Sequence, residues 1–141
     1  MKRLFLIINV LIPLLIGALL YYVFSPDVIF VSFIDSFLGR MGIHINYIDY
    51  GGTVILRFVR NYLLDMIWAY TLVFAMSFIL CNNAAEIMKM MIIIVCFTVV
   101  MEMLQCTNLV NGTFDILDIV VELLAEFIAV FIIKKHFFME D

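Results

Sequence analysis

Six acidic residues lie within or directly beside strongly apolar stretches of this 141-residue chain: Asp65, Glu102, Asp115, Asp118, Glu122 and Glu126. A carboxylate at the centre of a membrane helix costs roughly 2.5–3.5 kcal/mol on insertion scales, so these side chains should face other protein or a wet cavity rather than lipid. Carboxylates there can accept hydrogen bonds, pair with cations, hold a hard metal ion or exchange protons. Which of these they do depends on how the chain groups them.

Helical spacing places most of these acids on two polar stripes. The first stripe, with intervals of 3, 4 and 4 residues, consists of Asp115, Asp118, Glu122 and Glu126. The second, with intervals of 4 and 3, consists of Thr98, Glu102 and Gln105. Residues three or four apart share one face of a helix, so we expect two helices that turn these polar faces toward each other.

The composition requires that lipid surrounds the helices that carry these stripes. Hydrophobic residues make up 67% of the chain and charged residues 14%, against about 45–50% and about 25% in soluble domains. A hydrocarbon core about 30 Å thick needs roughly 20 apolar residues per helix. The sequence therefore predicts an all-α membrane protein, a single domain over residues 1–141, with spans at about 4–24, 63–80, 87–104 and 116–133. With a net charge of −4 and no basic block, the bilayer is the expected partner and nucleic acid is not.

The outer segment 25–62, between the first two spans, is predicted to hold an amphipathic helix that lies in the membrane interface. It should begin at the Ser25-Pro26-Asp27 sequence and end at Gly39. Residues 41–52 are compatible with a loop or a short strand, and a helix should restart at Thr53. In the first span, Asn9, Pro13 and Gly17 form a narrow stripe, which is typical of a packing seam against another helix.

Basic residues orient the chain, because lysine and arginine collect on the cytoplasmic side. Five of them fall on the side of both termini: Lys2, Arg3, Lys89, Lys134 and Lys135. Three fall on the other side: Arg40, Arg57 and Arg60. We therefore expect cytoplasmic termini, with most of the acids near the outer leaflet. Arg57 and Arg60 should approach those acids but would offset only two of their charges, so protonation, a hard cation or a cationic partner must supply the rest.

Several of these acids also have a purely structural interpretation. Asp65, Asp115 and Asp118 could cap or complement the beginning of a helix, where acids are common. Glu102 lies at the wrong end of its helix for that role, and Glu122 and Glu126 lie beyond the first turn. Those three could instead form interhelical hydrogen bonds with partners such as Asn9, Tyr70, Gln105 or Arg57.

The segment 60–70, which contains Trp68, resembles the VanZ-like membrane proteins of bacteria. So do the Glu102-x-x-Gln105 and Asp115-x-x-Asp118 pairs, and the resemblance covers residues 57–133. It implies a protein of the bacterial plasma membrane, in a family whose founding member is associated with resistance to the glycopeptide antibiotic teicoplanin. It implies no known reaction.

The first functional hypothesis is an envelope protein that binds a lipid-linked cell-wall precursor or a lipoglycopeptide at its outer side. The candidate ligand-binding residues are Arg57, Arg60, Asp65, Trp68, Glu102, Gln105, Asp115, Asp118 and Glu122. The alternative is an intramembrane enzyme that uses the carboxylates, with or without a divalent cation such as magnesium, on a lipid headgroup or phosphate. A third is proton or ion passage along the stripe from Glu122 to Glu126. No catalytic residue, confident metal site, cofactor or oligomeric state is assigned.

Overall fold

The computed structural model describes residues 2–24, 29–43, 53–80, 83–107 and 114–138, and all regular structure in these ranges is helical. The elements are α1 (Lys2–Phe24), α2 (Ile29–Arg40), α3 (Val54–Phe58), a π-helical turn η1 (Val59–Leu63), α4 (Leu64–Leu80), α5 (Ala84–Cys106) and α6 (Ile116–Phe138). Three helical stretches are long and apolar enough to cross a membrane, namely Arg3–Phe24, Val54–Leu80 and Glu86–Cys106. The predicted all-α class and the membrane-spanning character of the chain are confirmed at this level.

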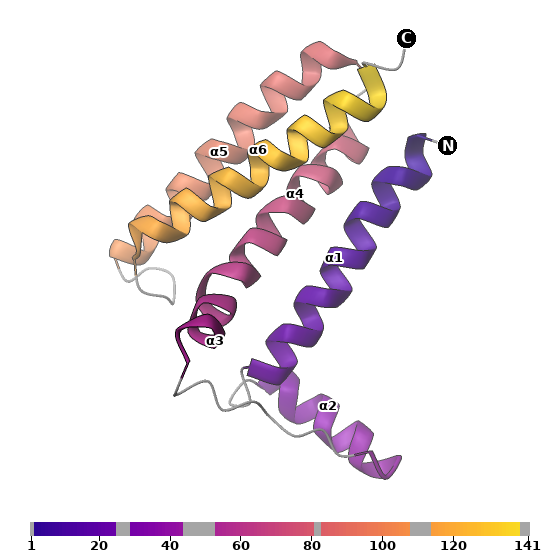
Figure 1. Cartoon of the computed structure of the whole chain (residues 1–141), viewed down its shortest axis with the longest axis vertical. Helices are drawn as coiled ribbons and strands as arrows, with labels where there is room; N and C mark the ends of the chain where they lie inside the picture. The colour runs from indigo at the N-terminus through magenta and orange to yellow at the C-terminus, as the bar shows by residue number, and fades with distance from the viewer. Residues whose placement is uncertain (1, 25–28, 44–52, 81–82, 108–113, 139–141) are drawn as a thin grey trace.

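Helices α1, α4, α5 and α6 run side by side and alternate in direction (Figure 1). Helix α4 lies in the middle of this bundle and packs against the other three, most extensively against α1 and α6. The beginning of α1 and the end of α6 lie at one end of the bundle, and α2 projects at an angle from the other (Figure 1). The Tyr22 hydroxyl of α1 donates a hydrogen bond to the Asp35 carboxylate and so ties α2 to α1.

The polar and small residues of α1 form the predicted seam with α4. Asn9 accepts a hydrogen bond from the Tyr70 hydroxyl at 2.7 Å and donates to its own helix at the Phe5 carbonyl. A Cβ atom at Gly17 would lie 3.1 Å from Cγ2 of Ile67. The seam therefore depends on glycine for close approach of the two helices and on asparagine for a polar link between them.

The hydrophobic core fills the half of the bundle nearest the termini. Its fully buried members come from the end of α4, the beginning of α5 and the end of α6, and include Phe74, Ile87, Met90, Ile94 and Ile133. The Phe5 ring of α1 closes this end by stacking on His136, with ring centroids 4.0 Å apart. The carboxylates lie beyond this core, toward the opposite end.

Some helix boundaries differ from the expectations. The helix that begins at Val54 continues without a break through α3 and η1 into α4, so the apolar stretch starts before residue 63. Helix α5 begins before the predicted span at about residue 87, because Asn83 and Glu86 form a capping box that starts it at Ala84.

The end of α2 also differs. Gly39 is the penultimate residue of this helix, and the chain leaves it at Gly42, which has a φ of 73°. The Ile43 amide bonds to the Leu38 carbonyl and the Gly42 amide to the Gly39 carbonyl, as in a Schellman motif. The expected features at residues 25–28 and in most of 41–52 lie outside the described residues.

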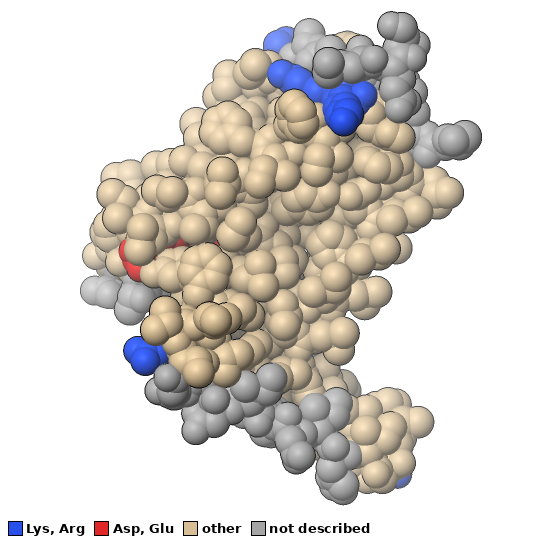
Figure 2. Space-filling model, in the orientation of Figure 1, with Lys and Arg blue, Asp and Glu red and all other residues tan. Residues whose placement is uncertain are grey.

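The described surface is largely uncharged between the two ends of the bundle. Figure 2 shows lysine and arginine atoms at both ends of the molecule, with a broad belt of mostly uncharged side chains between them and a small patch of acidic atoms at its left edge. Many large apolar side chains of α1 are exposed, including Leu4, Leu11, Leu15 and Leu19. Such a belt is costly in water and suits contact with lipid.

Candidate functional site

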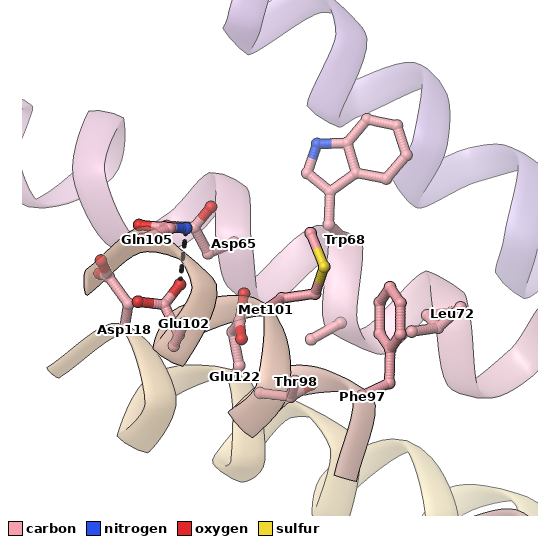
Figure 3. Close-up of a pocket in the computed structure, with 11 residues that line it drawn as sticks. Asp65, Trp68, Leu72, Phe97, Thr98, Met101, Glu102, Gln105, Asp118 and Glu122 are labelled. Carbon is pink, nitrogen blue, oxygen red and sulfur yellow. Dashed lines mark hydrogen bonds between the residues drawn. The ribbon is translucent and has the colours of Figure 1, made fainter. Parts of the chain in front are cut away.

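A cavity of about 500 Å³ lies between α4, α5 and α6, toward the end of the bundle away from the termini (Figure 3). Its described lining residues are Asp65, Trp68, Ala69 and Leu72 from α4, Phe97, Thr98, Met101, Glu102 and Gln105 from α5, and Asp118 and Glu122 from α6. This volume lies within the range of small-molecule sites in proteins. Six of the nine ligand-binding candidates named from the sequence line it.

Alternation of helix direction brings four of the acids to this cavity. Asp65 is the second residue of α4 and Asp118 lies in the first turn of α6, with Glu122 one turn further. Glu102 lies near the end of α5, which runs in the opposite direction. The beginnings of α4 and α6 therefore meet the end of α5.

Glu102 is the most buried acid in the cavity, with 5% of its surface exposed. Its Oε1 accepts a hydrogen bond from Nε2 of Gln105 at 3.1 Å (Figure 3). Its Oε2 is buried and has no hydrogen-bond partner among the described residues. An unsatisfied buried polar atom destabilises a structure by about 1–3 kcal/mol, and by more when the group is charged. A hydrogen-bond donor that binds to this oxygen would remove that penalty.

Glu126 forms a separate, deeper polar contact. It is fully buried, and its Oε1 accepts a hydrogen bond from Oγ1 of Thr98 at 2.6 Å, which joins α6 to α5. Its Oε2 has no hydrogen-bond partner within the described part of the chain. The partners suggested from the sequence were wrong here, because Asn9 bonds to Tyr70 on the far side of α4. Thr98 lines the cavity but Glu126 does not.

Asp115 bonds to the backbone at the beginning of α6 and does not line the cavity. Its Oδ1 accepts a hydrogen bond from the Leu117 amide at 2.9 Å, at the beginning of α6. Its Oδ2 accepts one from the Tyr62 hydroxyl at 3.3 Å, which links this end of α6 to η1. Asp115 is not among the cavity residues, and the geometry supports the helix-capping interpretation.

Arg57 and Arg60 do not reach the cavity either. They lie on α3 and η1, respectively 8 and 5 residues before Asp65 along one continuous helix. The helix carries them past the end of the cavity, Arg57 exposed and Arg60 half-buried. The described lining residues therefore include four acids and no lysine, arginine or histidine. The expectation that these arginines offset part of the charge of the acids stays a prediction.

The remaining wall of the cavity is apolar. Figure 3 shows Asp65, Glu102, Gln105 and Asp118 gathered at one end, and Trp68, Phe97 and Leu72 at the other. Trp68 was named as a candidate only because it lies in the segment that resembles VanZ-like proteins. The sequence did not single out Leu72, Phe97 or Met101, because such side chains occur on every face of these helices.

The acids at this end of the cavity come from three different helices. Among the described residues, no three His, Cys, Asp or Glu side chains lie close enough together to hold one metal ion. The arrangement offers acceptors from three helices at one end of a space much larger than an ion. It can receive hydrogen-bond donors or positive charge that are distributed over a larger group.

Comparisons with protein-family models, with curated proteins and with solved structures give no match for this chain.

Proposed function

We propose that this chain is a four-span protein of the bacterial plasma membrane that binds a ligand at the outer side of the cell envelope. The ligand we propose is lipid-linked or a lipoglycopeptide, as the resemblance to VanZ-like proteins suggests, with a contribution to teicoplanin resistance. The observation that carries the proposal is Glu102, whose buried Oε2 lacks a partner among the described residues in a cavity lined by three further acids. Binding of a cationic or hydrogen-bond-donating group there satisfies this oxygen.

Helix α6 serves as the fourth span in this proposal. It has 23 residues, enough for about 34 Å at 1.5 Å per residue. Its three acids turn away from lipid, since Glu126 is buried and Asp118 and Glu122 line the cavity. The side chains it exposes are large and apolar, including Leu124 and Phe131. These properties support a membrane span despite the three acids.

The outward orientation of the cavity follows from the distribution of basic residues. Arg3, Lys89 and the Lys134–Lys135 pair belong to the helix ends opposite the cavity, which favours the cytoplasm for that end. Helix α2 then lies at the outer interface, where its exposed Phe33 and Phe37 can enter the headgroup region. The cavity acids come to lie near the outer leaflet, on the side where glycopeptide antibiotics act on cell-wall precursors.

The test uses one acid that lines the cavity and one that does not. Asp118→Asn and Asp115→Asn make the same change three residues apart, and asparagine retains the capping ability of Asp115. In a teicoplanin-susceptible bacterium, the wild-type chain and Asp115→Asn should raise the antibiotic concentration that stops growth. Asp118→Asn should abolish this increase while reaching the same level in the membrane.

Two results would contradict the proposal. If the wild-type chain leaves teicoplanin susceptibility unchanged, the resistance role is wrong. If Asp118→Asn protects as well as the wild type, the cavity has no part in the effect. The intramembrane-enzyme hypothesis remains a prediction from the sequence, since the described acids offer no shared metal site to support it.

A further inference from the structure

The cavity changes in polarity along the direction of its helices. Its acids lie toward the beginnings of α4 and α6 and the end of α5, and its aromatic and aliphatic side chains lie nearer the middle of the bundle (Figure 3). Phe97 precedes Glu102 by five residues on α5, about 7.5 Å along the helix. Leu72 follows Asp65 by seven residues on α4, about 10 Å deeper in the same direction. A molecule that fills this space needs a polar end at the surface and an apolar end toward the bilayer centre.

The apolar end of the cavity is also open toward lipid. Trp68 on α4 is 53% exposed and Phe97 on α5 is 54% exposed, although both line the cavity. Helices α4 and α5 pack less extensively against each other than α4 packs against α1 or α6. This side of the cavity therefore offers a lateral route from the acyl-chain region.

The polar end of the cavity favours a positively charged ligand. Asp65, Glu102, Asp118 and Glu122 line it, and no basic side chain lies among the described lining residues. Glu102 is 5% exposed, and its Oε2 lacks a partner in the described ranges. Because no three acids there can share a metal ion, a group with several N–H donors suits the spacing better than a bare cation.

We propose that the ligand is a cationic amphiphile, with a protonated amine head group and an aliphatic chain, that enters from the bilayer between α4 and α5. The amine lies among the carboxylates and donates to Oε2 of Glu102, while the chain packs against Trp68, Leu72 and Phe97. This inference rests on the proposed function, because it specifies what the same cavity binds. The four acids, with no basic side chain among the described lining residues, disfavour an anionic lipid, and a short amine lacks the part that would fill the apolar end.

Trp68 provides a direct readout, because it is the only tryptophan in the chain and lines the cavity. We would reconstitute the full-length protein in lipid nanodiscs and titrate it with dodecylamine brominated at the end of its chain, which quenches nearby indole fluorescence. Concentrations are expressed as mole fractions in the bilayer. We expect saturable quenching by the amine and only weak, non-saturable quenching by the equivalent brominated alkyl sulfate.

Three variants locate the two ends of the ligand. Glu102→Gln should weaken amine binding about tenfold, because a buried charge-assisted hydrogen bond is lost, whereas Asp115→Asn should bind as the wild type does. Phe97→Ala removes a half-exposed ring and should weaken binding of the long amine about fivefold. The same variant should leave the affinity for butylamine, measured by competition with the long amine, unchanged. Size-exclusion profiles and circular dichroism confirm that each variant is folded.

The outcomes separate this inference from the proposed function. Equal quenching by amine and sulfate that Glu102→Gln does not alter would show partition into the bilayer only, and would overturn the inference. Saturable binding in which butylamine competes as well as dodecylamine would overturn the amphiphile but leave a cation-binding cavity. Displacement of the amine by millimolar Mg²⁺ at constant ionic strength would assign the acids to a metal ion instead. A wild-type protein that binds no amine but still protects cells from teicoplanin would refute this inference alone.

Discussion

The hydrogen bond between Thr98 and Glu126 should make a measurable contribution to the stability of the bundle. Thr98→Val replaces a hydroxyl group with a methyl group of similar size, so its effect is confined to this bond. Glu126 is fully buried, and the substitution leaves both of its carboxyl oxygens without a partner among the described residues. Hydrogen bonds to charged groups contribute about 1.5–3 kcal/mol in soluble proteins, and polar contacts in membrane bundles average about 0.6 kcal/mol with a maximum near 1.7 kcal/mol.

We therefore expect Thr98→Val to lower the free energy of unfolding by about 1–2 kcal/mol, or roughly a fivefold to thirtyfold change in the folded ratio. Thr71→Val is the matched control. Thr71 is equally buried, at 5% exposure, but its hydroxyl donates to the Ile67 carbonyl of its own helix at 2.7 Å. That carbonyl keeps its backbone partner, so the control should cost less than about 0.5 kcal/mol.

The assay is reversible unfolding in mixed micelles or steric trapping in bicelles, with both valine variants and the wild type side by side. Combining Thr98→Val with Glu126→Leu should recover part of the loss, because no unpaired carboxyl group then remains in the core. Equal free-energy changes for Thr98→Val and Thr71→Val would refute the reasoning, because they would mean that the interhelical bond adds nothing.

Three further substitutions test the helix seam, a glycine within α2 and a helix cap. Gly17→Val should destabilise the bundle by about 1–3 kcal/mol, because its side chain would be forced against Ile67. Gly39→Ala, which has no neighbour within 4 Å, should stabilise it by about 0.4–1 kcal/mol in the same unfolding assay. Asn83→Ala should cost about 1 kcal/mol and speed hydrogen exchange in the first turn of α5, because the hydrogen bond to the Glu86 amide is lost. Unchanged exchange there would contradict the capping role of Asn83.

The helices and the convergence of most acids could be predicted from the sequence, because both follow from strong local rules. Long apolar stretches fix which segments are helical, and the spacing of Glu102, Asp118 and Glu122 fixes which faces are polar. The seam formed by Asn9 and Gly17 was predicted for the same reason, since small and polar residues stand out on an apolar helix.

Other features depend on how each helix is rotated about its own axis and how far it is shifted along the bundle. The spacing of residues in the sequence does not determine either. Glu126 and Thr98 lie on the two polar stripes that were expected to face each other, but their pairing with each other depends on how α5 and α6 turn relative to each other. Asp115 is one residue before the beginning of α6, so its carboxylate bonds to the Leu117 amide instead of pointing into the cavity. The apolar wall was missed because Phe97 has nothing in its local sequence to set it apart from other lipid-facing residues.

The central claim, that a cavity between α4, α5 and α6 opens to the outside of the membrane, can be tested with two neighbouring cysteine substitutions. Met101 lines the cavity, whereas Val100 is exposed on the bundle surface at the same depth. In a background with Cys81, Cys96 and Cys106 replaced by alanine, a charged membrane-impermeant thiol reagent is added outside intact cells. Met101→Cys should react and Val100→Cys should not. An unreactive Met101→Cys, or labelling of it only from the cytoplasmic side of inverted vesicles, would contradict the account.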